Sequence, residues 1–184
     1  EEGSSYGSNP GEQIKRLTDS AENLRMKDPS QSLKLCSLAL DKSLKTGDCA
    51  LIAKTYKSYG ICVFFAGDYA KALDYLKHSM KLADSCDLPV CKADCMNNIA
   101  NIYGEIGQMD KSGEYYEQAV KIYRRQKDES NTAKALLGLS KYYTHKGATE
   151  KALKLTEEAL RIFESQKDDN GRAYSFQAMG DLKL

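Results

Sequence analysis

Three asparagines, Asn97, Asn98 and Asn101, lie within five residues near the middle of the chain. Asparagine is a poor residue for a helix interior, so three in one helix-forming segment need a reason other than helix propensity. An amide side chain donates and accepts hydrogen bonds, and it can pair with both backbone groups of an extended peptide. The alternative is a solvated helix face without a ligand. The cluster predicts polar recognition.

Residues suited to catalysis or metal binding are sparse. His78 and His145 are the two histidines of the chain, and no Gly-rich phosphate loop or nucleophile motif accompanies them. Cys86, Cys91 and Cys95 follow the spacing C-x4-C-x3-C, but zinc sites use tighter pairs and a fourth ligand. We therefore predict no enzyme activity, no metal and no cofactor.

The six cysteines divide into two groups. Three are expected to point inward as small apolar side chains, namely Cys36, Cys62 and Cys95. Three lie in or beside linkers, namely Cys49, Cys86 and Cys91, and the short separation of the last two would allow a disulfide. This usage leans towards a reducing compartment. We expect a cytoplasmic protein, with a periplasmic or extracytoplasmic sensor domain as the alternative.

Composition excludes two classes of partner. The 184 residues include 27 basic and 26 acidic side chains, a net charge of +1, so no overall field favours nucleic acid or an anionic membrane. No apolar run approaches the ~20 residues of a membrane-spanning helix. With three prolines and helix formers throughout, the chain is expected to be all-α.

The elements that would position the asparagines repeat along the chain. Four segments align at an offset of 40, beginning at Asp28, Asp68, Gln108 and Ala148. Their small residues fall into two columns: Ser32, Ala72, Ser112 and Ala152; and Ala39, Ser79, Ala119 and Ala159. A third column lies upstream of the segments: Ser20, Gly60, Ala100, Ser140 and Gly180. Such columns indicate close helix crossings. A further column, Gly67, Gly107 and Gly147, suits left-handed residues that end one helix before the next.

We therefore expect antiparallel helix pairs in four repeats, about 12–48, 49–88, 89–128 and 129–168, after a flexible segment 1–11. Residues 169–184 would begin a further repeat or form a capping helix. Residues 12–184 would form a single domain. Because the terminal segment GRAYSFQAMGDLKL carries apolar residues such as Phe176 and Met179, we expect the polypeptide to continue or a second chain to cover this helix.

The pattern of small, aromatic and glycine columns resembles the tetratricopeptide repeat. The segments SYGICVFFAGDYAKALDYLKHSM and NNIANIYGEIGQMDKSGEYYEQAVKIY carry the resemblance, which extends from about Gln13 to Leu184. The 40-residue period is similar to that of kinesin light chains and of bacterial sensory and regulatory proteins. The chain departs from the family in lacking tryptophan, and in placing Ser20 and Asn23 where glycine and tyrosine are usual. The resemblance implies a right-handed α-solenoid.

The resemblance also implies a concave face lined by the first helix of each pair. The expected binding residues on that face are Lys54, Lys57, Ile61, Phe64, Asp94, Asn97, Asn98, Asn101, Lys134, Leu137, Lys141 and His145. The alternative for Phe64 and its neighbour Phe65 is packing beneath an adjacent helix. Co-chaperones of the carboxylate-clamp type within this family hold a C-terminal carboxylate with five residues. At the equivalent positions of this chain, Lys57, Asn98 and Lys134 match the clamp residues, whereas Ile61 and Gly138 do not. Three of five are too few for a chaperone-tail receptor.

We therefore predict a scaffold that binds protein or peptide segments, as the sensory or interaction portion of a larger signalling or regulatory protein. The expected partner carries acidic and bulky apolar residues, and a homodimer through the C-terminal helix is a further expectation. Two alternatives are a peptide-responsive regulator domain and a structural scaffold acting through its convex face or terminal helix. No nucleic-acid partner and no membrane insertion are expected.

Overall fold

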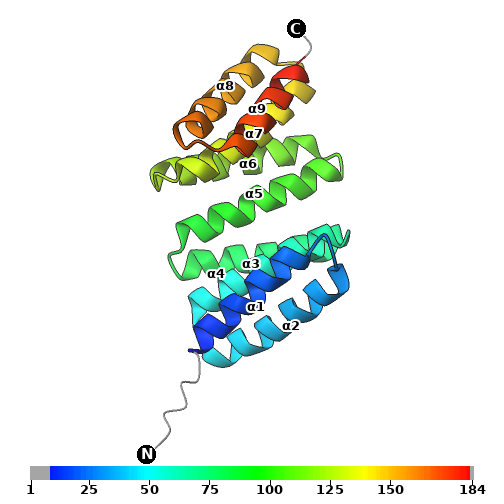
Figure 1. Ribbon diagram of the computed structural model, residues 1–184, viewed down its shortest axis with the longest axis vertical. Helices are drawn as coiled ribbons and strands as arrows, with labels where there is room; N and C mark the ends of the chain where they lie inside the picture. The colour runs from blue at the N-terminus through cyan, green and yellow to red at the C-terminus, as the bar shows by residue number, and fades with distance from the viewer. Residues whose placement is uncertain (1–8, 183–184) are drawn as a thin grey trace, which may run out of the picture. The chain divides into compact units, whose positions relative to one another are not determined.

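The computed structural model describes residues 9–182, and all regular secondary structure in that range is helical (Figure 1). The helices are α1 (Pro10–Leu24), α2 (Pro29–Thr46), α3 (Cys49–Phe65), α4 (Tyr69–Ser85), α5 (Pro89–Glu105), α6 (Met109–Arg125), α7 (Glu129–His145), α8 (Thr149–Ser165) and α9 (Asp169–Gly180). The prediction of an all-α chain with four helix pairs and a ninth helix is confirmed. Helix α1 begins inside the expected flexible segment 1–11, of which residues 1–8 lie outside the described range.

Contacts divide the chain into two compact units, which we describe separately. Unit 1 comprises residues 1–91 and unit 2 comprises residues 92–184, with the boundary in the first turn of α5. In unit 1, α1 packs on α2 and α3, and α3 packs on α4. In unit 2, α7 packs on α6, α8 and α9. A single continuous domain over residues 12–184 stays a prediction.

The helices end at regularly spaced left-handed residues. From α2 onwards, a residue with positive φ occurs every 20 positions, at Gly47, Gly67, Asp87, Gly107, Lys127, Gly147 and Lys167. At Gly67, for example, φ is 87°, and the N–H donates to the carbonyl of Phe64 at 2.9 Å. These left-handed residues terminate each helix and reverse the chain. The predicted role of the glycine column is confirmed.

Aspartates begin most of the helices. The carboxylate of each accepts a hydrogen bond from a backbone N–H in the first turn, as seen at Asp28, Asp48, Asp68, Asp128 and Asp168. An N-cap of this kind stabilises a helix by about 1 kcal/mol. Five helices therefore have their own start signal, whereas Gln108 before α6 and Ala148 before α8 form no side-chain cap.

Buried serines fix the helix crossings. Ser32 Oγ donates to the carbonyl of Ala21 at 2.8 Å, and Ser79 Oγ donates to that of Ala53 at 2.7 Å. In unit 2, Ser112 Oγ donates to the carbonyl of Ala100 at 2.8 Å. A hydroxyl reaches a neighbouring backbone in this way only where two helices approach closely, so the small-residue columns mark crossings as expected.

The disulfide joins a different pair from the one that the sequence spacing allowed. Cys86 at the end of α4 is bonded to Cys49 at the start of α3, and not to Cys91. Cys91 instead lies 5% exposed in the core beside Ala53 and Ala83. The two ends of the α3–α4 hairpin meet, whereas the first turn of α5 directs Cys91 inward. The inward cysteines Cys36, Cys62 and Cys95 are buried, as predicted.

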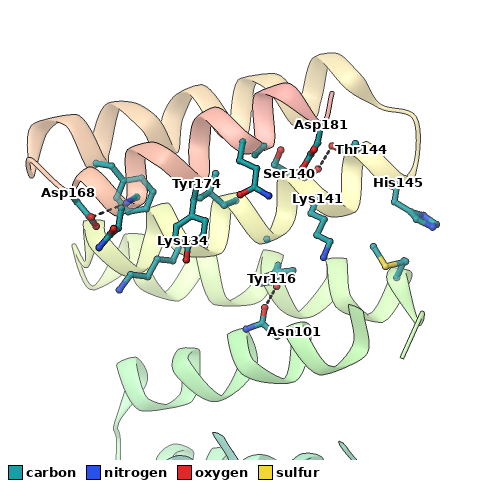
Figure 2. A pocket seen from close by; sticks show the side chains of 18 residues that line it. Asn101, Tyr116, Lys134, Ser140, Lys141, Thr144, His145, Asp168, Tyr174 and Asp181 are labelled. Atoms are coloured by element: carbon teal, nitrogen blue, oxygen red, sulfur yellow. Dashed lines mark hydrogen bonds between the residues drawn. The ribbon is translucent and has the colours of Figure 1, made fainter. Parts of the chain in front are cut away.

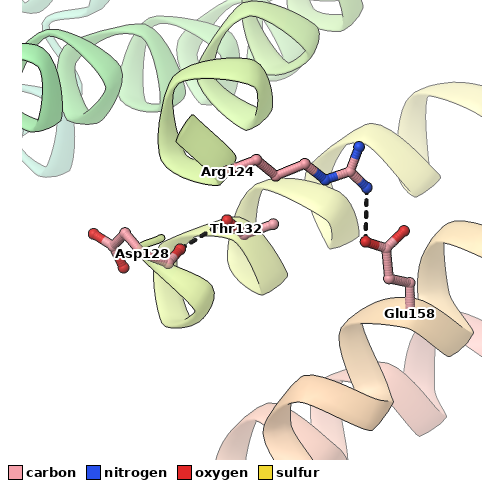
Figure 3. A network of polar contacts seen from close by, with 4 residues as sticks. All are labelled: Arg124, Asp128, Thr132 and Glu158. Carbon is pink, nitrogen blue, oxygen red and sulfur yellow. Dashed lines mark hydrogen bonds and ion pairs between the residues drawn. The ribbon is translucent and has the colours of Figure 1, made fainter. Parts of the chain in front are cut away.

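Within unit 2, a surface ion pair connects α6 and α8, each of which is the second helix of its repeat. Arg124 on α6 and Glu158 on α8 approach to 2.7 Å, while Thr132 Oγ1 donates to the Asp128 carbonyl at the start of α7 (Figure 3). Both charged side chains are substantially exposed, so the ion pair contributes little to stability. The apolar and small-residue crossings hold the unit together.

Candidate functional site

Unit 2 contains a groove of about 1250 Å³. Helices α7 and α9 supply most of its lining, α5 contributes Asn101, α6 contributes Met109 and Tyr116, and α8 contributes Phe163 (Figure 2). The structure brings five of the predicted binding residues together in this groove: Asn101, Lys134, Leu137, Lys141 and His145.

The 40-residue register explains which side chains line the groove. Lys134, Leu137 and Lys141 lie on one face of α7. Adding 40 to these positions gives Tyr174 and Gln177 of α9 and Asp181 directly after it, which also line the groove. Sequence reasoning missed these three, although the register that selected the α7 residues also selects them.

Tyr116 forms the floor of the groove, and its ring packs directly against Gly138. A Cβ atom added to Gly138 would lie 2.2 Å from Cζ of Tyr116, so only glycine leaves room for the ring. The Tyr116 hydroxyl donates to Oδ1 of Asn101 (Figure 2). Burial and the charge of Glu105 raise the pKa of Tyr116, so the hydroxyl keeps its proton and donates at neutral pH. This bond directs the Asn101 NH₂ group away from Tyr116.

Two cations on α7 have no partner in the described part of the chain. The side chains of Lys134 and Lys141 are exposed, and neither forms an ion pair or hydrogen bond with any residue from 9 to 182. Exposed His145 follows them at the end of α7. The α7 wall of the groove is therefore basic.

The α9 wall is polar and aromatic, with an aspartate at each end. Asp168 is engaged as the N-cap of α9, because its Oδ1 accepts from the Gly171 N–H at 2.9 Å. Asp181 is exposed at the other end of the helix. Between them Tyr174 is 65% exposed and lines the groove (Figure 2). An exposed tyrosine offers an aromatic face and a hydroxyl to a ligand.

A close contact holds α9 in place. A Cβ atom added to Gly171 would lie 2.2 Å from Cδ1 of Phe163, which is 1% exposed. Ser175 Oγ, also buried, donates to the Gly171 carbonyl at 2.9 Å. The Phe163 ring thus supports the helix that presents Tyr174.

Three predicted residues of α5 lie in unit 2 but do not line this groove. The Asn98 NH₂ group donates to the Asp94 carbonyl at 2.8 Å, which occupies it within its own helix. The Asp94 carboxylate accepts from the Tyr123 hydroxyl at 2.8 Å. Oδ1 of Asn97 is buried and accepts no hydrogen bond in the described part of the chain. Of the three asparagines, only Asn101 contributes to the groove.

Four predicted residues belong to unit 1 and are described there. Phe64 is half-buried, its ring centroid 5.7 Å from that of Tyr69 and 5.2 Å from that of Phe65. Phe65 is 41% exposed beneath the Arg25 guanidinium. The remaining three residues lie on α3, where Lys54 is exposed and Lys57 and Ile61 are partly buried. All four stay predicted binding residues.

Two general features of the described residues bear on function. No group of three or more His, Cys, Asp or Glu side chains between residues 9 and 182 is arranged to hold a metal ion. No helix in that range is long and apolar enough to span a membrane.

Comparisons with known proteins agree with the repeat pattern. Residues 92–165 match the family model of the tetratricopeptide repeat. No curated protein matches the chain by sequence. Among solved structures, the apo form of RapI superposes with a TM-score of 0.83 at 16% identity, covering 98% of this chain and 66% of RapI.

Two further structures share the fold. A putative kinesin light chain with TPR-like repeats from Podosopora anserina has a TM-score of 0.73 at 14% identity, covering 95% of this chain and 86% of that one. A Rap protein complexed with competence and sporulation factor has a TM-score of 0.63 at 18% identity, covering 92% and 52%. Residues 92–165 are thus tetratricopeptide repeats, and the chain that contains them has the α-solenoid fold of this family.

Proposed function

We propose that the chain is an interaction module that binds a protein or peptide segment in the groove of unit 2. The observation that carries this proposal is the pair of lysines, Lys134 and Lys141, which project into a groove of about 1250 Å³ without a described partner. Two cations on one wall attract a segment that carries carboxylates.

The same groove provides apolar and aromatic contacts for a bulky side chain. Leu137 and Met109 are partly buried at its edge, and Tyr174 is exposed within it. Large aromatic residues at the centre of an interface commonly contribute much of the binding energy. We therefore propose a partner segment that combines acidic residues with a bulky apolar residue.

The similar structures support ligand binding on this fold. One of them is a Rap protein in complex with competence and sporulation factor. Since this chain covers 66% of RapI and 52% of the complexed Rap protein, we also propose that it is the sensory or interaction part of a longer signalling or regulatory protein.

A selection of linear peptides displayed on phage tests the proposed groove. We expect peptides selected on the 184-residue chain to be enriched in Asp and Glu together with an aromatic or branched apolar residue. Their affinity, measured by fluorescence anisotropy, should fall about five- to thirtyfold for Lys134→Ala/Lys141→Ala, because two exposed charge pairs contribute about 1–2 kcal/mol together.

The matched control is Lys121→Ala, which removes an exposed lysine of α6 outside the groove. It should leave the affinity within about twofold of the unsubstituted chain. Selected peptides that bind the double variant as tightly as the unsubstituted chain would show that another surface is the binding site.

We also propose that α9 supports self-association. Phe176 on α9 is 54% exposed, and a large apolar side chain at this exposure favours contact with another surface. Sedimentation velocity should show dimers at high protein concentration, and Phe176→Asp should shift the population to monomer. A chain that stays monomeric at every concentration would contradict this proposal.

A further inference from the structure

The two groove lysines are separated by a fixed distance along α7. Lys134 and Lys141 are seven residues apart, which corresponds to two helical turns and about 10 Å along the axis. Both line the groove, so they lie on the same face. A segment that pairs with both lysines must place two carboxylates about 10 Å apart on one side.

The amide side chains of the groove favour an extended occupant. Asn101 offers its NH₂ group, since its oxygen already accepts from Tyr116. Asn170 and Gln177 on α9 are exposed, and their side chains form no hydrogen bond with the described residues. Amides pair with backbone N–H and C=O groups only where these are free, which holds for extended and polyproline II segments but not for a helix.

In a polyproline II segment, residues three apart face the same side at a distance of about 9 Å. In a β-strand, residues on the same side lie about 7 or 13 Å apart, which fits the lysine pair less well. We infer that the groove recognises an extended segment with two acidic residues three positions apart, acid-x-x-acid, one carboxylate beside each lysine. The inference rests on the function proposed above and specifies its ligand.

Removing the negative charge on the opposite wall should change peptide affinity in the opposite direction to removing a lysine. Asp181, the residue directly after α9, lies 40 positions after Lys141 of α7, and both line the groove. A carboxylate bound beside Lys141 is therefore repelled by Asp181. Asp181→Asn should increase the affinity for an acid-x-x-acid peptide about two- to threefold at low salt, whereas Lys141→Ala should reduce it.

The experiment uses synthetic peptides of identical composition, about a dozen residues long, with proline in the background to favour polyproline II. Two glutamates stand one, three or seven positions apart, and affinity for the 184-residue chain is measured by fluorescence anisotropy. We expect the peptide with a separation of three to bind about two- to fivefold more tightly than the others, because the others lose one exposed charge pair. Lys134→Ala and Lys141→Ala should each remove this preference, and Lys121→Ala should keep it.

The outcomes separate this inference from the proposed function. Equal affinity for the three acidic peptides would overturn the spacing and retain an acid-binding groove. Preference for a separation of seven would indicate a helical occupant and would also overturn the inference. If none of the acidic peptides bound, the proposed acidic ligand itself would be wrong. A lower affinity in Asp181→Asn would contradict the placement of a carboxylate beside Lys141.

Discussion

Replacing Phe163 with alanine is expected to lower the free energy of unfolding by about 3–5 kcal/mol, the largest effect that we predict. The ring is 1% exposed and fills the space against Gly171 of α9, where a cavity would form. Helix α9 would lose its support, and peptide binding should weaken together with stability. Urea denaturation followed by circular dichroism measures the first effect.

The matched control for Phe163→Ala is Tyr174→Ala. Tyr174 lies on the supported helix but is 65% exposed, so its removal should change the unfolding free energy by less than about 1 kcal/mol. A loss below about 1 kcal/mol for Phe163→Ala would mean that the α8–α9 contact does not hold the last helix in place.

Replacing Gly138 with alanine is expected to destabilise the chain by about 1–3 kcal/mol, although alanine has the higher helix propensity. The new Cβ would lie 2.2 Å from Cζ of Tyr116, a buried ring that must then shift. The hydrogen bond from Tyr116 to Asn101 would be lost with that shift. Denaturation and peptide affinity report the two consequences.

Two variants test the cause of this effect. Gly104 in α5 has only an ordinary contact at 3.5 Å, so Gly104→Ala should be neutral or stabilise by up to about 1 kcal/mol. Gly138→Ala combined with Tyr116→Leu should lose less stability than the two changes summed, because the shorter side chain relieves the overlap. Stabilisation by Gly138→Ala alone would show that the ring moves at little cost.

The helix pairs could be predicted because their signals are local and repeated. The glycines before α4, α6 and α8 and the aspartate caps each act within one turn, and the small-residue columns recur at a fixed offset. Gly113, although glycine is a poor helix former, lies within the continuous helix α6. Gly113 instead gives space to the ring of Tyr142, to which an added Cβ would be 2.8 Å.

The site could be predicted only in part, because hydrogen bonding decides which polar residues are available. Asn98 and Asn101 differ by three positions, but the first bonds to a carbonyl of its own helix and the second receives the Tyr116 hydroxyl. Tyr116 stands where the neighbouring repeats have Leu76 and Thr156, so the repeat pattern gives no indication of its role. The Cys49–Cys86 disulfide joins residues 37 positions apart, which come together only because the start of α3 and the end of α4 lie side by side in the folded hairpin.

The left-handed residues every 20 positions have a consequence for how such a groove changes over evolution. Because each helix from α3 to α8 has 17 residues and is followed by a turn of the same length, a side chain can be exchanged at one position without altering the backbone that presents it. Lys134 and Tyr174 hold equivalent places in successive repeats, yet one is a cation and the other an aromatic ring. Substitution within such a column changes ligand preference while the scaffold stays constant, whereas insertion of one residue in α7 would rotate all later residues of that helix by about 100° relative to the groove.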